Sequence, residues 1–243
     1  MATEKQTKGN LTRRGFLTGT AGIGGGIALA SFASAFGVRE AHAAHDRMDD
    51  VATIANLAAT AETLAATSYY YTILNNPFDL SDDYLSYLKL AMSSELYHLK
   101  VLQSLGGASL AQQFYTPKKF LSDFAVNTAT FITAETAFTG AYLAATRRFA
   151  ELGVPRLAAT TAQHAATEAE HLALTRMIGG LVPNPNALPA PIFYNVSDAV
   201  PVLGPFLQGG AGFAGPVPFP GEDAIRSLAG TEAFPVPVFL NVF

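Results

Sequence analysis

The sequence predicts an all-α protein built around a four-helix bundle, and three observations support this prediction. Four segments carry apolar side chains at alternating steps of three and four residues, which is typical of a helix with one buried face. Each segment has a glutamate in the middle of that apolar stripe, and the glutamates form two pairs whose members are 33 residues apart. The midpoint of each pair falls on residues that favour a turn. The chain is therefore predicted to contain a helical hairpin that occurs twice.

The repeat includes histidines as well as glutamates. The second glutamate of each pair is followed three residues later by a histidine, which gives the order E, ExxH, E, ExxH along the chain. A single ExxH is common by chance, whereas two at the same offset from a preceding glutamate are a specific signal. The six side chains concerned are Glu62, Glu95, His98, Glu135, Glu168 and His171.

The turn signals lie where a symmetric hairpin requires them. Phe78 lies midway between the first pair of glutamates, within residues 75–79, which include two asparagines and a proline. Leu152 lies midway between the second pair, next to Gly153 and close to Pro155. The two glutamates of each hairpin should therefore face each other at the same height.

The first hairpin is expected to pair a helix over residues 50–74 with a helix over residues 82–105. Asp49 or Asp50 can cap the first helix, and the Asn-Asn-Pro sequence that follows stops it. Ser81 can cap the second helix, two aspartates fill its first turn, and two consecutive glycines end it.

The second hairpin is expected to follow a long crossover. Residues 106–116 must return the chain to the opposite end of the bundle, and an extended segment of this length can span a helix of about 24 residues. Thr116 followed by proline is interpreted as an N-cap and first-turn proline, so the third helix should cover residues 117–152. The fourth helix should run from Pro155 to the glycine pair at 179–180.

Carboxylates at these positions have a chemical consequence. Residues i and i+3 share one face of a helix, so each ExxH points a carboxylate and an imidazole at the same place. Together the four helices would bring four carboxylates and two imidazoles into the core. Burial and mutual repulsion would raise the pKa values of such carboxylates, and two divalent cations would offset their charge.

This pattern resembles the ferritin-like superfamily, the carboxylate-bridged dimetal four-helix bundles. Within it, the chain is most similar to exported bacterial ferritin-like proteins related to desiccation-associated proteins, over residues 48–180. The resemblance implies that the six side chains above are metal ligands for two Fe or two Mn ions. It also implies that Glu95 and Glu168 bridge the two ions.

Other polar side chains near the motif are given less weight. His164 lies on the stripe of the fourth helix, one turn before Glu168, and is interpreted as a core or supporting histidine rather than a seventh ligand. Tyr97 and Tyr142 could carry electrons or protons, but aromatic packing is the preferred interpretation. Of the three consecutive tyrosines at 69–71, at most one can face the site.

The composition of the chain limits which binding partners and which kinds of metal site are possible. The chain has 243 residues, 49% of them hydrophobic and only 14% charged, which is enough for one well-cored domain. It has no cysteine, so thiolate metal sites and disulfides are excluded. Beyond residue 43 the chain has ten basic and 17 acidic residues, a formal net charge of −7, which disfavours nucleic acid as a partner.

Residues 1–43 are predicted to be a twin-arginine signal peptide. Arg13 and Arg14 precede an uncharged stretch of 24 residues, and Ala41-His42-Ala43 offers a small-residue cleavage site. A retained membrane anchor is the alternative, but three consecutive glycines and mild hydrophobicity favour cleavage. The expected destination is the periplasm or the extracellular space, with the twin-arginine machinery as a partner.

The bundle is assigned to residues 44–180 and a Pro-rich C-terminal extension to residues 181–243. This extension holds 11 of the 14 prolines, so it is predicted to be irregular, with one short helix near residues 222–228. It is too apolar for a solvated linker and is expected to pack on the bundle. A contact with a membrane or with a second copy in a homo-oligomer is the alternative.

Two functions are compatible with these patterns. The first is an exported protein with a dinuclear iron or manganese centre that uses O2 or peroxide, with ferroxidase or peroxide-detoxifying activity implied by the resemblance. The second is a non-enzymatic desiccation or stress-related scaffold with the same fold. Iron storage would need a cage, and no fifth ferritin helix is evident to support one.

Overall fold

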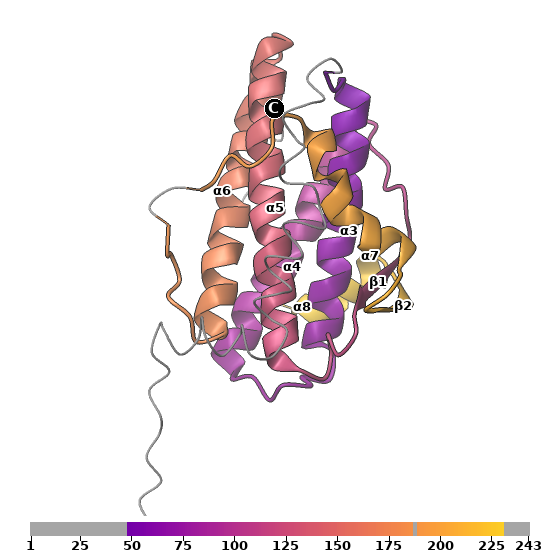
Figure 1. Cartoon of the computed structure of the whole chain (residues 1–243), viewed down its shortest axis with the longest axis vertical. Coiled ribbons are helices and arrows are strands. Elements are labelled where there is room, and N and C mark those ends of the chain that lie inside the picture. Colours follow the sequence, from indigo (N-terminus) through magenta and orange to yellow (C-terminus); the bar gives the residue numbers. More distant parts are fainter. Residues whose placement is uncertain (1–47, 187–188, 231–243) are drawn as a thin grey trace, which may run out of the picture. The chain divides into compact units, whose positions relative to one another are not determined.

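The computed structural model of the chain describes residues 48–186 and 189–230, which all belong to one compact unit. This part of the chain is mostly helical, with a single small sheet of two strands (Figure 1). Four long helices lie side by side and form what we call the four-helix core: α3 (Val51–Ile73), α4 (Asp82–Ser104), α5 (Phe124–Glu151) and α6 (Pro155–Ile178). The α3–α4 and α5–α6 pairs are the two hairpins of the repeat.

The ends of three of these helices follow the local signals in the sequence. Asp50 caps α3, where its carboxylate accepts a hydrogen bond of 2.7 Å from the backbone N–H of Thr53. Ser81 is the N-cap of α4, and Pro155 occupies the first turn of α6, where its missing N–H costs nothing. These features depend on a few neighbouring residues, and the sequence therefore predicts them well.

The start of α5 differs from the sequence prediction, which is wrong here. Thr116 and Pro117 do not begin a helix but lie in strand β1 (Gln113–Pro117), and the helix starts seven residues later at Phe124. Its N-cap is Asp123, whose carboxylate accepts hydrogen bonds from the N–H groups of Ala125 and Val126. Threonine followed by proline is compatible with a strand as well as with a helix start, and pairing with a distant segment decides between them.

Replacing Asp123 by alanine should therefore destabilise the protein by about 1 kcal/mol, because two N–H groups in the first turn lose their acceptor. Urea unfolding of the purified protein would measure the change. Asp123→Asn keeps a side-chain oxygen and should retain most of the stability. A larger loss in Thr116→Ala than in Asp123→Ala would contradict this helix boundary.

The connection between α4 and α5 runs back along α3. Gly107 lets the chain pass α3 closely, since a Cβ there would lie 2.8 Å from the carbonyl oxygen of Ala55. Further on, the backbone N–H of Leu110 donates to the hydroxyl of Thr60 on α3. The crossover ends where the Phe124 ring lies 5.4 Å from that of Phe78 in the α3–α4 turn. Helix α5 thus begins at the opposite end of the core from where α4 finishes.

The small sheet joins the crossover to the C-terminal extension. Strand β1 pairs antiparallel with β2 (Phe213–Pro218), and Phe114 faces Val217 in the register. The register shifts between Phe114 and Thr116, which indicates a bulge. The sequence prediction was all-α and did not include this sheet, because the two strands are about 100 residues apart and no local pattern links them.

The extension is more regular than predicted. The short helix expected near its end is present as α8 (Glu222–Ala229), but a 3-10 helix, η1 (Val196–Ala199), and a helix, α7 (Val200–Gln208), precede it. Pro201 lies in the first turn of α7, where proline is tolerated, while Pro205 lies inside this helix of nine residues. A helix this short loses little stability from one missing hydrogen bond. The proline content of the extension therefore does not prevent a helix here, although it led to the prediction of irregular structure.

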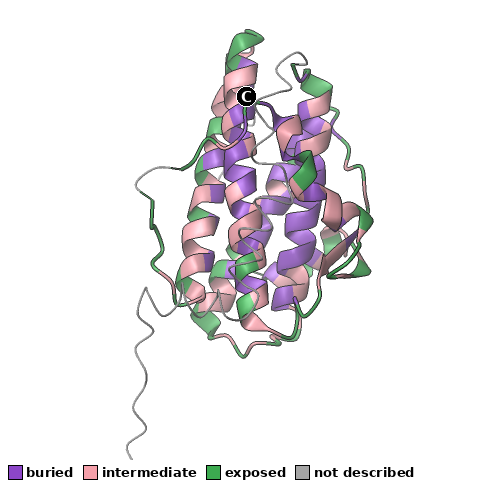
Figure 2. Ribbon diagram, in the orientation of Figure 1, coloured by how far each residue is buried: buried purple, intermediate pink, exposed green. Residues whose placement is uncertain are grey.

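The described part of the extension packs on the four-helix core. Ile225 of α8 is fully buried in a cluster with residues of α3 and α4, among them Tyr69 and Met92. At the other end Phe193 and Val196 pack beside Phe149 of α5. Figure 2 shows the buried residues gathered along the facing sides of the long helices. The extension therefore covers apolar surface that the helices alone would leave in water.

The predicted signal peptide, residues 1–43, lies outside the described residues. Within the described ranges, no helix is both long enough and apolar enough to cross a membrane.

Candidate metal centre

The structure brings the six side chains of the sequence motif together in the middle of the four-helix core. All four helices contribute side chains that meet at one place along the core. Helices α3 and α5 supply one glutamate each, and α4 and α6 supply a glutamate and a histidine each. All six are buried, and none is more than 6% exposed. Four carboxylates without solvent are unusual, because burial without compensation strongly disfavours a charged group.

The first of two overlapping groups, here called the first half-site, consists of Glu62, Glu95, His98 and Glu168. One ligand atom from each of the four lies within 4.8 Å of the others. The Nδ1 atom of His98 is 3.5 Å from Glu62 Oε1, 3.5 Å from Glu95 Oε2 and 3.2 Å from Glu168 Oε1.

The second half-site consists of Glu135 and His171 together with the same Glu95 and Glu168. The Nδ1 atom of His171 is 2.9 Å from Glu95 Oε1, 3.4 Å from Glu168 Oε2 and 4.0 Å from Glu135 Oε2. Each half-site therefore has one glutamate and one histidine of its own and two carboxylates in common with the other.

The two shared carboxylates direct one oxygen to each half-site. Glu95 presents Oε2 to His98 and Oε1 to His171, and Glu168 presents Oε1 to His98 and Oε2 to His171. A carboxylate placed in this way can bind two cations at once, one through each oxygen. The arrangement has an approximate two-fold symmetry that mirrors the sequence repeat.

Many of the polar atoms at the centre have no hydrogen-bond partner. They include one oxygen each of Glu62, Glu95 and Glu135, both oxygens of Glu168 and the Nδ1 atom of His98. An unpaired buried polar atom costs about 1–3 kcal/mol, and more if it is charged. The donor set of carboxylate oxygens and imidazole nitrogens suits divalent cations, so these buried groups could hold metal ions.

The protein's own electrostatics divide the carboxylates into two kinds. Burial, and then the charge of Glu95, raises the pKa values of Glu62 and Glu135 well above the usual value. Burial acts in the same direction on Glu95 and Glu168, but the adjacent histidines outweigh it and lower both pKa values. Without a bound cation, burial and repulsion therefore favour the protonated form of the outer glutamates more than that of the shared pair.

The neighbouring carboxylates also shift the pKa values of the two motif histidines. Burial alone would lower the pKa of each imidazole, but Glu62 beside His98 and Glu95 beside His171 raise both pKa values well above the usual value. Protons therefore occupy positions that cations would take. Binding of a metal ion at either half-site must displace them.

Two tyrosines complete the centre, and they cross between the hairpins. Tyr69 of α3 donates its hydroxyl to Glu135 of α5 at 2.5 Å, and Tyr142 of α5 donates to Glu62 of α3. Each tyrosine is seven residues after the glutamate of its own helix, so the pair follows the same repeat. The sequence prediction preferred a packing role for Tyr142 over a role in electron or proton transfer and did not include its hydrogen bond to Glu62, although the equal spacing is a visible signal.

These hydroxyls should matter for metal affinity. Tyr142→Phe removes the donor that holds Glu62, and Tyr69→Phe does the same for Glu135, so each should weaken binding at its facing half-site about 10–100-fold. Calorimetric titration with Mn²⁺ would measure this. Tyr71→Phe is the matched control, because its hydroxyl donates instead to the carbonyl of Pro218. Equal effects of all three changes would contradict a specific role.

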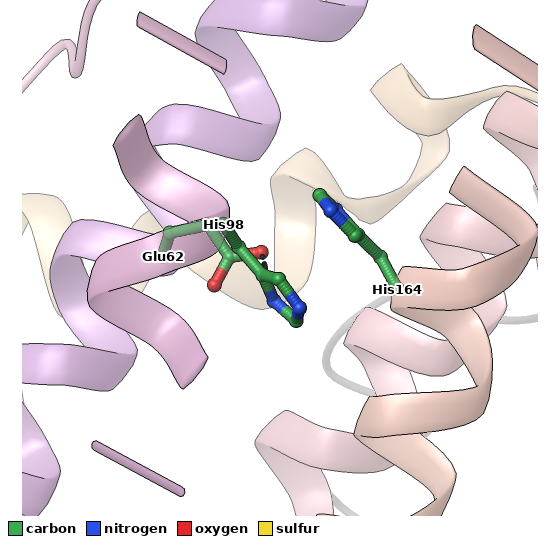
Figure 3. A group of neighbouring side chains, drawn as sticks. All are labelled: Glu62, His98 and His164. Carbon is green, nitrogen blue, oxygen red and sulfur yellow. Dashed lines mark ion pairs between the residues drawn. The ribbon is translucent and has the colours of Figure 1, made fainter. Parts of the chain in front are cut away.

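His164 lies against the first half-site. Its side chain is fully buried, and its ring stacks on that of His98 with 3.8 Å between the centroids (Figure 3). Burial, and then the neighbouring His98, lowers the pKa of His164 well below its usual value, so the imidazole is neutral. His164 is thus buried on the inward face of α6, as its place on the apolar stripe predicts, and it contacts a motif histidine.

A small cavity of about 30 Å³ lies between α3 and α5 under α7. Its lining is apolar and includes Ala58, Ala61, Val202 and Leu203, together with Tyr142, which hydrogen-bonds Glu62. Such a lining offers a water molecule almost no hydrogen-bond partners. The cavity therefore offers room for a small apolar molecule next to the first half-site.

Comparison of the chain with protein-family models, with curated proteins and with solved structures finds no match.

Proposed function

We propose that this chain is an exported ferritin-like protein whose four-helix core binds a dinuclear iron or manganese centre. The observation that carries the proposal is the pair of overlapping half-sites, which share Glu95 and Glu168 and use different oxygens of each. Glu62 and His98 would complete one ion's ligands, and Glu135 and His171 the other's.

The donor set supports iron or manganese. The carboxylate oxygens are hard ligands, which suit manganese, and the imidazole nitrogens are borderline ligands, which suit iron. No thiolate is available to favour a softer metal because the chain has no cysteine. Two divalent ions would also neutralise the four carboxylates. The charge of these ions would offset the burial and the mutual repulsion that raise the pKa values of Glu62 and Glu135.

The proposed activity is oxidation or reduction with O2 or peroxide, in protection against stress. A bound pair of iron or manganese ions would supply the electrons for such chemistry. The chain's own residues bind and orient: the tyrosine hydroxyls hold the outer carboxylates, and the apolar core excludes bulk water. The apolar lining of the cavity beside Tyr142 favours O2, which is apolar, over peroxide as the molecule admitted there.

Elemental analysis of protein purified from its native host tests the proposal. The expected result is close to two ions of iron or manganese per chain. Addition of Fe²⁺ to the metal-free protein, followed by O2 or peroxide, should then give oxidation faster than in buffer alone. A metal content near zero, with no binding when Fe²⁺ or Mn²⁺ is added, would overturn the proposal.

A metal-free scaffold in desiccation or stress protection is the second candidate. The observation in its favour is the closure of the site, since no motif side chain is more than 6% exposed and the extension packs on the core. It predicts neither turnover of Fe²⁺ or peroxide nor any effect of chelators on stability.

Export by the twin-arginine route is also part of the proposal and rests on the sequence around Arg13 and Arg14. N-terminal sequencing of the protein recovered from the periplasm or medium should find a chain that begins near residue 44. An intact first residue in the membrane fraction would favour a retained anchor instead.

A further inference from the structure

The two half-sites follow the sequence repeat with one exception. A shift of 73 residues relates the glutamates, histidines and tyrosines of one hairpin to those of the other. The same shift relates His164 of α6 to Ala91 of α4, which is also buried. The first half-site therefore has an imidazole next to it where the second half-site has a methyl group.

His164 has no partner for either ring nitrogen among the described residues. It is 0% exposed, so bulk solvent does not reach it. Its neighbours are rings: His98 is stacked at 3.8 Å with an interplanar angle of 23°, and Tyr142 meets it edge-on at 5.0 Å. Burial of an imidazole with both nitrogens unpaired is costly, and apolar packing alone would be served better by a phenyl ring.

The ring nitrogen lies within reach of an ion in the first half-site. One ligand atom each from Glu62, His98 and His164 lies within 4.8 Å of the other two. Two atoms that bind one ion at about 2.1 Å are at most about 4.2 Å apart, so a shift below about 1 Å brings the nitrogen close enough. The ring must also rotate out of its stacking on His98, because the in-plane lone pairs of two stacked rings do not converge on one ion. Figure 3 shows the ring extending from α6 towards Glu62 and His98.

We propose that His164 is a further ligand of the ion in the first half-site, which makes the two half-sites unequal. This inference rests on the proposed dinuclear centre. With one more nitrogen donor, the first half-site binds its ion more tightly than the second, so the ions load in order. A heterodinuclear centre then becomes accessible, because a nitrogen-richer site prefers a metal later in the first transition row.

The nitrogen count tests this directly in the full wild-type chain. One equivalent of Mn²⁺ is added to metal-free protein, and pulsed electron paramagnetic resonance counts the histidine nitrogens coupled to the ion. Two coupled imidazoles, from His98 and His164, are the expected result. A single coupled imidazole would overturn the inference.

A second measurement compares the half-sites one at a time. Glu135→Ala leaves the first half-site with its full set of ligands, and Glu62→Ala does the same for the second. His164→Phe, which keeps a flat ring on His98, should weaken Mn²⁺ binding about ten-fold or more in the Glu135→Ala protein. In the Glu62→Ala protein the same change should alter the dissociation constant less than about two-fold.

The outcomes separate this inference from the proposed function. Equal weakening in both backgrounds, or none in either, overturns the role of His164 even if the wild-type protein binds two ions. Absence of Mn²⁺ and Fe²⁺ binding by the wild-type chain overturns both. If a background variant does not fold, which circular dichroism would show, the nitrogen count in the wild-type chain decides alone.

Discussion

Truncation of Glu168 to alanine is expected to abolish binding of both metal ions, whereas truncation of Glu135 is expected to abolish binding of one. Glu168 presents one oxygen to each half-site, so its removal takes a ligand from both. Glu135 belongs to the second half-site only. Elemental analysis after removal of excess metal should find close to zero ions per chain in the first variant and about one in the second, compared with two in the wild type.

Glu170→Ala is the matched control for this series. Glu170 lies on the same helix two residues away, but it is exposed and turned from the site, so its loss should leave two ions per chain. Circular dichroism of each variant would confirm that the helices persist. Full metal content in Glu168→Ala, or equal content in Glu168→Ala and Glu135→Ala, would show that Glu168 is not shared between two ions.

Chelation of the metal should lower the melting temperature of the wild-type protein by roughly 10–30 °C. A ligand that binds only the folded state stabilises it by about 2.7–4.1 kcal/mol when present at 100 to 1,000 times its dissociation constant, and two such ions give about 5–8 kcal/mol. For a chain of this size each kcal/mol corresponds to roughly 2–4 °C. Differential scanning calorimetry with and without a chelator would measure the shift.

A variant that lacks both complete half-sites provides the control for the shift in melting temperature. In the metal-free protein the four buried carboxylates repel one another and several of their oxygens lack a hydrogen-bond partner, so removal of the metal should destabilise the folded state. A Glu62→Ala, Glu135→Ala double variant, which keeps no complete half-site, should show little change on chelation. A wild-type melting temperature that does not respond to chelation would support the metal-free scaffold instead.

The features of this protein that the sequence predicts well are those that depend on residues close together in the chain. Helical periodicity places Glu95 and His98 on one face of a helix, and caps such as Asp50 and Ser81 act over three residues. The equal spacing of the glutamates then places them level across each hairpin. For these reasons the amino-acid sequence alone is enough to name the six side chains that meet at the centre.

The parts that the sequence does not predict depend on distant segments. Thr116 and Pro117 have the composition of a helix start, yet pairing with β2 nearly 100 residues later makes them a strand. The prolines of the extension suggest irregular chain, yet α7 forms on the surface of the core. In both cases the energy of packing against a remote partner exceeds the small preference of the local sequence.

Periodicity and repeat spacing were sufficient to specify the four helices, their pairing in hairpins and the six polar side chains that face inward, because a repeat with helical period leaves few other ways to bury its apolar stripes. The contacts across helices, by contrast, emerge only from the folded arrangement. It places Tyr69 on Glu135, Tyr142 on Glu62 and His164 on His98. Those contacts depend on how the two hairpins approach and rotate against each other, and spacing along the chain contains no information about that geometry.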